Sequence, residues 1–223
     1  MKLKYTNWKD ITVDLFLNIQ QRLSMIEKTG DEDIDNINRY IVIISCLSDK
    51  DEDVVADLDV NEFGRLVRET NFLNDMPKAK ITDKYKINGN EYYVHLNLQE
   101  MTMAQYIDFQ TFYKDKDKYT KQILACFLIP KGKKYCEDYK LEDVINDIGQ
   151  MSIVDAYSIM FFFTLSFMSL TKTMLTYLNR KMKKMMRKEK NKERKMKIQE
   201  AIMNIQQVQT LVENGDGLDL LKL

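Results

Sequence analysis

Proline and glycine are scarce in this sequence, with two prolines and seven glycines among 223 residues. Proline removes a backbone donor and glycine adds backbone freedom, so both interrupt helices, and their scarcity favours long ones. Histidine is scarcer still, since His95 is the single one. The three cysteines, Cys46, Cys126 and Cys136, form no Cys-x-x-Cys pair. A zinc site requires clustered His and Cys, so we expect no metal site.

The motifs of common enzyme classes are also missing. No Ser or Cys stands in a Gly-x-Ser-x-Gly turn, and no cysteine has a neighbouring base. Alternating Asp49, Asp51 and Asp53 resemble part of a calcium loop, but its turn glycine and distal Glu are absent, which favours a solvated acidic turn. Residues 130–134 place one glycine among three lysines without the spacing of a phosphate-binding loop. We therefore expect no catalytic residue and no cofactor, in a protein that is not an enzyme.

The cysteines and the first residues indicate a cytoplasmic protein. Cys46 and Cys126 lie inside apolar runs, where a thiol behaves as a small hydrophobe, and an odd number of cysteines suits a reducing compartment. Residues 1–8 lack the apolar core of a signal peptide.

Charge is distributed unevenly, although the formal net charge is zero. Residues 180–197 hold eleven Lys and Arg against two Glu, a local charge of +9. Residues 31–62 hold eleven acids against two bases. Such segregation indicates that the basic segment contacts a different environment from the rest of the chain.

Hydrophobic spacing and capping residues predict a mainly α fold (α+β). The expected helices cover 8–29 with Thr12 as its cap, 37–47, 59–72, 102–113, 119–129 and 141–148. A reciprocal cap between Asp59 and Glu62 opens the third, and a capping box between Thr102 and Gln105 opens the fourth. Residues 37–47 also fit a buried strand, although their neighbours favour a helix. Alternating apolar residues flank Asn88-Gly89, which predicts one β-hairpin near 84–96.

A long C-terminal helix is expected after Ser152. Neither Gly nor Pro occurs between Gln150 and Gly215, and 60 unbroken helical residues would extend about 90 Å. Part of this helix must therefore project or pack on something else. The sequence thus suggests a helical body with a β-hairpin over 1–150, a buried apolar helix over 151–178, and a basic helical arm with a hydrophobic tail over 179–223.

Residues 156–171 are all uncharged and have three interpretations. As a helix they span about 24 Å, less than the roughly 30 Å of a bilayer core. The basic run that follows suits a membrane protein's cytoplasmic side. Asp155, Ser158, Ser166, Ser169 and Thr173 mark one semi-polar stripe, which favours a core helix over a membrane span or an interfacial helix.

The basic segment 180–197 also has several interpretations. It could be a solvated helix that only reaches from the core to a partner. It could also bind an acidic protein surface, such as that of another copy, or nucleic acid, or an anionic membrane. Met182, Met185, Met186 and Met196 form a narrow apolar seam on it, and no aromatic residue is present to stack on bases. The expected partner-binding residues are Arg180, Lys184, Arg187, Lys188, Ile198, Ile202, Ile205, Val212, Leu220 and Leu221. From Ile198 to Val212 these follow a seam that needs a mate on this chain or another.

The order of segments resembles small helical assembly proteins of tailed bacteriophages, notably the tail-assembly-chaperone type. The resemblance covers roughly residues 5–170. The Lys/Asn/Ile-rich composition of the chain is similar to that of proteins from crAss-like phages of gut bacteria. The segments that carry it are Trp8-Lys-Asp-Ile-Thr-Val, Leu58-Asp-Val-Asn-Glu before Phe72-Leu, Met101-Thr-Met-Ala-Gln-Tyr-Ile-Asp, and Ile129-Pro-Lys-Gly-Lys-Lys-Tyr before Phe161-Phe-Phe. The basic arm after Asn179 has no counterpart in the family pattern.

This resemblance implies a non-enzymatic morphogenesis or virion protein, either a chaperone or a ring or adaptor component of the neck or tail. Its expected partners are other phage structural proteins and copies of itself, in the host cytoplasm during assembly. The basic arm leaves room for a component retained in the virion. The alternative is a small membrane-anchored protein with its helix at 156–171 and a basic cytoplasmic segment.

Overall fold

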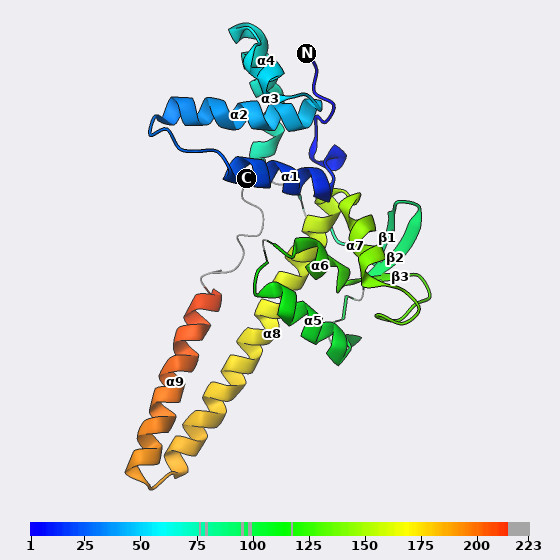
Figure 1. The fold of residues 1–223 in the computed structure, drawn as a ribbon. Coiled ribbons are helices and arrows are strands. Elements are labelled where there is room, and N and C mark those ends of the chain that lie inside the picture. The colour runs from blue at the N-terminus through cyan, green and yellow to red at the C-terminus, as the bar shows by residue number, and fades with distance from the viewer. Residues whose placement is uncertain (76, 79, 95, 98–99, 117, 214–223) are drawn as a thin grey trace. The chain divides into compact units, whose positions relative to one another are not determined.

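The computed structural model describes residues 1–75, 77–78, 80–94, 96–97, 100–116 and 118–213, and shows a helix-rich chain with one small antiparallel sheet (Figure 1). This confirms the expected mainly α fold. The chain divides into two compact units, Met1–Ile159 and Met160–Lys222, and the boundary falls within one continuous helix.

The first unit begins with two helices joined by a shared polar cluster. A 3-10 turn, η1 (Trp8–Asp10), precedes α1 (Val13–Ser24), where Thr12 accepts a hydrogen bond from the Leu15 amide. This confirms the predicted cap, although the helix ends before residue 29. Helix α2 (Glu32–Ser48) settles the ambiguity over 37–47 in favour of a helix. The Arg22 guanidinium donates to Ser45 Oγ and Cys46 Sγ, both at 3.2 Å, and to Glu52 Oε1 at 2.6 Å.

Two short helices and a second 3-10 turn follow. These are α3 (Glu52–Ala56), α4 (Val60–Glu69) and η2 (Thr70–Asn74). Asp59 accepts from the amides of Asn61 and Glu62, as predicted for the start of α4. Glu62 instead pairs with the N-terminal amine, so it does not complete the expected reciprocal cap.

The predicted β-hairpin is present, as β1 (Lys84–Ile87) and β2 (Asn90–Val94). Asn88 and Gly89 have φ of 50° and 85°, as a two-residue turn between right-twisted strands requires. A third strand, β3 (Leu128–Pro130), pairs antiparallel with β2. It was predicted as helix. The helix α6 (Thr120–Ala125) ends early because 128–130 satisfies its backbone on the sheet edge.

Helices α5 (Met103–Tyr113) and α7 (Leu141–Gly149) complete the packing around the sheet. The capping box of α5 is confirmed, with Thr102 and Gln105 each bonding the other's backbone amide. Gln105 also donates to the Cys126 carbonyl at 2.6 Å. The fully buried side chains of this region come mainly from α6, β3 and α7 and include Ile123, Leu124, Phe127, Leu128 and Ile148.

The start of the last long helix is tied to the start of α1. Thr12 and Ser152 form an isolated antiparallel bridge, in which the Ile153 amide donates to the Ile11 carbonyl at 2.8 Å. Two chain segments about 140 residues apart therefore lie side by side where they enter their helices. At the start of α8, the Val154 amide donates to Ser152 Oγ at 3.3 Å.

The long C-terminal helix is broken, contrary to the unbroken run predicted. Helix α8 (Ile153–Lys188) is followed by a short turn and by α9 (Lys192–Glu213), which runs back antiparallel to it (Figure 1). The turn uses neither Gly nor Pro. Asn191 Oδ1 accepts from the amides of Glu193 and Arg194 at 3.0 and 3.1 Å and so caps α9. We call the two antiparallel helices from Met160 onward the helical hairpin.

Burial along α8 is uneven, whereas a buried helix was expected over 151–178. Ile153, Ile159 and Phe163 are buried, but Leu165, Leu170, Met174 and Tyr177 are exposed. Within the described residues, α8 is long and apolar enough, by length and composition, to cross a membrane. Its most apolar 18-residue stretch has a mean hydropathy of 1.6, and 33% of that stretch is buried.

Candidate interaction surface

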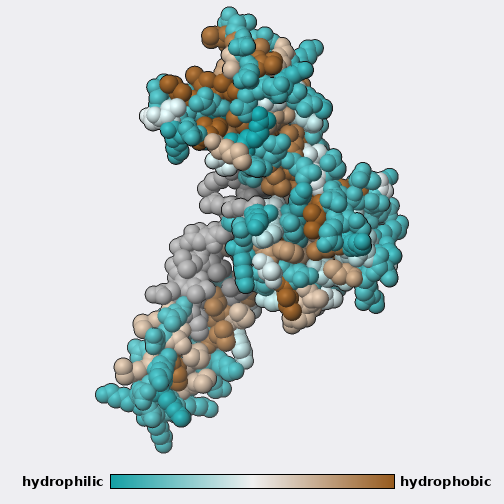
Figure 2. Space-filling model, in the orientation of Figure 1, coloured by the Kyte–Doolittle hydropathy of each residue, from teal (hydrophilic) through white to brown (hydrophobic). Residues whose placement is uncertain are grey.

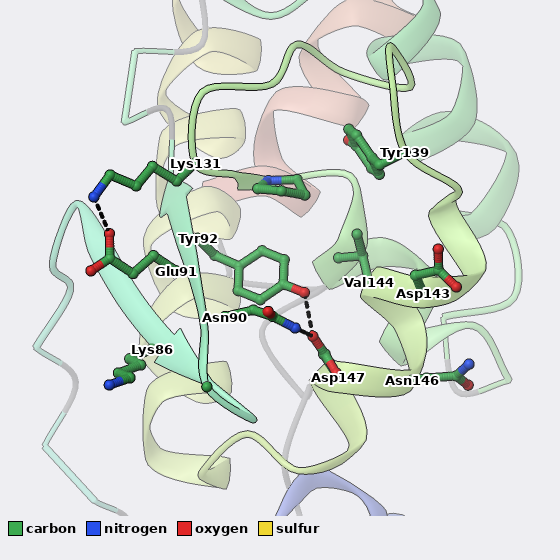
Figure 3. Close-up of a pocket in the computed structure, with 12 residues that line it drawn as sticks. Lys86, Asn90, Glu91, Tyr92, Lys131, Tyr139, Asp143, Val144, Asn146 and Asp147 are labelled. Carbon is green, nitrogen blue, oxygen red and sulfur yellow. Dashed lines mark hydrogen bonds and ion pairs between the residues drawn. The ribbon is translucent and has the colours of Figure 1, made fainter.

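The most developed polar site of the first unit surrounds Asp147. Its Oδ1 accepts from Asn88 Nδ2 at 3.0 Å, and its Oδ2 accepts from Asn90 Nδ2 at 2.6 Å and from the Tyr92 hydroxyl at 2.5 Å. Figure 3 shows the last two bonds, which join β2 to α7 beside a hollow of about 690 Å³. Lys131 and Glu91 form an ion pair at its rim, with 2.6 Å between Nζ and Oε2.

The electrostatics of Asp147 are those of a stabilised carboxylate. Burial alone raises its pKa, but the three donated hydrogen bonds outweigh burial and hold the pKa below its usual value. Burial, followed by the bond to Asp147, raises the pKa of the Tyr92 hydroxyl far above its usual range. An ionised acceptor with three donors and a phenol that stays protonated hold the β-turn against α7.

The cysteines of the first unit give no sign of activation. Burial raises the pKa of Cys46, despite the neighbouring Arg22, and raises that of Cys126 to about 12. The Tyr135 hydroxyl lies 3.7 Å from Cys126 Sγ and 2.9 Å from Asp108 Oδ2. Buried thiols with raised pKa values behave as core residues, since the thiolate is the reactive form.

Metal-ligating residues do not cluster in the described part of the chain. Within it, no group of three or more His, Cys, Asp or Glu side chains is arranged to hold an ion. His95, the single histidine, lies outside the described residues.

The helical hairpin places α9, which holds the described part of the seam expected over 198–212, alongside α8 (Figure 1). Leu175 of α8 and Ile202 of α9 are each 7% exposed. Residues at helical spacing from these two are half-buried: Leu178, Met182, Met186, Ile198 and Ala201. The described part of the seam, Ile198, Ala201 and Ile202, is therefore turned away from solvent in the antiparallel pair of helices.

The outer face of α8 is apolar in its middle part. Leu170, Met174 and Tyr177 recur at i, i+4 and i+7, which places them on one face, and they are 48%, 57% and 61% exposed. Lys181 and Lys184 continue the same face toward the turn. On α9, Met196 and Met203 are also exposed. Sequence reasoning missed these three α8 residues because a uniformly apolar run does not show which side its partner helix covers.

The turn end of the helical hairpin carries the positive charge. We call residues 180–197 the basic tip. All eleven of its Lys and Arg side chains are exposed, and Figure 2 shows hydrophilic residues gathered at this end. Lys197 pairs with Glu193 at 3.1 Å, one turn away. A cationic surface of this density repels itself and favours an anionic partner.

The residues predicted to bind a partner fall into two groups. Arg180, Lys184, Arg187 and Lys188 are exposed on the basic tip. Ile198 and Ile202 instead face the seam, and the buried Ile202 is not available to another molecule. Met185 and Met196 are exposed, while Met182 and Met186 are half-buried, so the four methionines do not form a single seam. Leu220 and Leu221 lie outside the described residues, and Ile205 and Val212 lie on α9 but their side chains are outside what the structure describes.

An acidic surface of the first unit has the opposite composition. We call residues 31–62 the acidic segment. Its side chains Asp51, Asp53 and Asp57, around α3, are exposed, and Val54 and Val60 are exposed beside them at 48% and 87%. Surface valines among carboxylates form a mixed apolar and acidic face.

No protein-family model, no curated protein and no solved structure matches this chain.

Proposed function

We propose that this chain is a non-enzymatic assembly protein of tailed bacteriophages that works through protein–protein contacts, as a chaperone or as a ring or adaptor component of the neck or tail. The resemblance in segment order supports the phage assignment. The chemistry of the described residues supports action by contact, because the most developed polar site is a structural carboxylate and two of the three thiols, those of Cys46 and Cys126, are buried.

The observation that carries the proposal is the outer surface of the helical hairpin. Leu170, Met174 and Tyr177 form an exposed apolar stripe that leads directly into the basic tip. Soluble monomers rarely leave contiguous apolar patches uncovered, so such a stripe beside a charged surface is typical of a site that binds another protein.

The test is replacement of the gene in an infecting phage. A chain that ends at Asn179, and a full-length chain with Lys183, Lys184, Arg187 and Lys188 all changed to Gln, should both lose particle assembly. The second variant keeps the seam, so circular dichroism should show unchanged helix content. Normal particle yield with both variants would overturn the proposal.

Two further measurements complete this test. A full-length chain with Lys133→Gln and Lys134→Gln, on an exposed loop of the first unit, is the matched control and should assemble normally. Mass spectrometry of purified particles then separates the two roles. A chaperone is absent from finished particles, whereas a ring or adaptor is present at a stoichiometry that matches its symmetry.

The second candidate function is a small membrane-anchored protein, and the uncovered face of α8 favours it. Helix α8 is long and apolar enough to span a membrane, and only a third of its most apolar stretch is buried. A basic segment follows it, as on the cytoplasmic side of a membrane span. An anchor requires that the chain sediment with membranes and become soluble without detergent when 150–178 is deleted. An assembly protein stays in the supernatant at full length.

A further inference from the structure

We propose that the basic tip docks onto the acidic segment of a second copy of this chain, so that copies associate head to tail. This inference rests on the proposed contact function and names the partner of the same surface. Two features of the described residues carry it: matched charge and matched apolar side chains.

The formal charges of the two segments are opposite and equal in size. The basic tip carries eleven cations and two Glu, and the acidic segment carries eleven acids and two bases. The rest of the chain has no segment of either sign to match them. Complementary potentials steer association and suppress the contact of like surfaces, so the tip avoids another tip and approaches an acidic face.

Several of the acids are available to a partner. Glu52 pairs with Arg22, and Asp49 pairs with Lys4. Among the described ion pairs, none involves Asp51, Asp53 or Asp57, and all three side chains are exposed. This α3 region therefore offers uncompensated carboxylates.

Exposed apolar side chains accompany the charges on both surfaces. Met185 and Met196 of the basic tip are 47% and 64% exposed, and Val54 and Val60 lie among the carboxylates. Charge alone gives orientation and rate, whereas buried apolar area supplies lasting affinity. A flexible methionine adapts its shape to a small β-branched partner.

The two surfaces are different parts of the chain, so the contact they form is heterologous. A heterologous contact repeats from copy to copy and produces a closed ring or an open filament, depending on the rotation between copies. This geometry suits an assembly protein, and it predicts that self-association weakens with added salt.

The experiment uses two full-length variants and their mixture. One reverses the tip, with Lys183, Lys184, Arg187 and Lys188 all changed to Glu. The other reverses the α3 region, with Asp51, Asp53 and Asp57 all changed to Lys. Asp51 makes no side-chain cap hydrogen bond, so its loss leaves the start of α3 intact. Sedimentation velocity at low salt should show association of the wild type and at least about tenfold weaker association of each variant alone.

Mixing the two variants is the decisive step. Each variant still carries one wild-type surface, and the reversed tip of one variant is opposite in charge to the reversed α3 region of the other, so an equimolar mixture should associate again. Lys133→Glu with Lys134→Glu should associate as the wild type does. A wild type that is monomeric at low salt would overturn the inference. So would variants that stay monomeric when mixed, because the tip would then bind its own chain. If the wild type is monomeric but the variant with Lys183, Lys184, Arg187 and Lys188 changed to Gln still loses particle assembly, the inference fails and the proposed function stands.

Discussion

The Tyr92 hydroxyl donates a 2.5 Å hydrogen bond to Asp147 Oδ2 and so joins strand β2 to helix α7. Asp147→Asn should destabilise the first unit by about 2 kcal/mol. The amide nitrogen of Asn would place a donor where Oδ2 now accepts from Asn90 and Tyr92. Tyr92→Phe removes one donor and should cost somewhat less. Urea denaturation followed by circular dichroism measures both changes, and an unaltered midpoint in Asp147→Asn would show that the bonds contribute nothing.

The same carboxylate makes the stability of the first unit depend on pH. Its pKa in the fold lies below its ordinary value of 3.8, so the stabilisation is complete above that value and is lost as the pH falls through the folded pKa. The stability of Asp147→Asn should therefore fall less steeply than that of the wild type over this acidic range. Parallel denaturation profiles of the two proteins below pH 4 would contradict the assignment.

Two glycines should respond in opposite directions to alanine. A Cβ at Gly64, inside α4, meets Arg68 at 3.8 Å, which is ordinary contact, so Gly64→Ala should stabilise by about 0.5–1 kcal/mol. A Cβ at Gly149 would collide with the carboxylate of Asp14, which is held by Lys121 with 2.8 Å between Nζ and Oδ1. Gly149→Ala should therefore destabilise, by roughly 1–3 kcal/mol. Thermal melting of both variants checks the sign of each.

The turn of the helical hairpin should depend on Asn191. Asn191→Ala removes the cap of α9 and should reduce its stability by about 1 kcal/mol. Hydrogen exchange should then speed up over the first turn of α9. Asn204→Ala, at an exposed position within the same helix, is the control and should leave exchange unchanged or slower because alanine favours helix.

The seam of the helical hairpin should be far more sensitive than its outer face. Ile202→Ala and Leu175→Ala each empty a buried position and should cost about 2–5 kcal/mol. Met203→Ala, 52% exposed on the outer face, should change stability by less than about 0.5 kcal/mol. Limited proteolysis of 189–191 reads out hairpin opening, and equal protection in all three variants would show that the seam does not hold the helices together.

Local signals predicted most of the secondary structure. The Asn88-Gly89 turn, the Thr102 capping box and the caps at Thr12 and Asp59 were readable because each depends on residues within three positions of one another. Strand β3 was not readable in this way. Its residues fit an apolar helix, and only pairing with β2, whose partner residues lie 34 to 38 positions earlier in the chain, decides their conformation.

By itself the sequence determined a helix-rich chain with one β-hairpin, an oily segment after Ser152 and a strongly cationic segment after Asn179, because composition and short-range spacing control these features. The tertiary structure decided the rest. It turned the expected single helix back at Asn191, buried Ile202 within the helical hairpin and left Leu170, Met174 and Tyr177 exposed. Burial depends on which helix faces which, and that is a property of packing between distant segments rather than of any one of them.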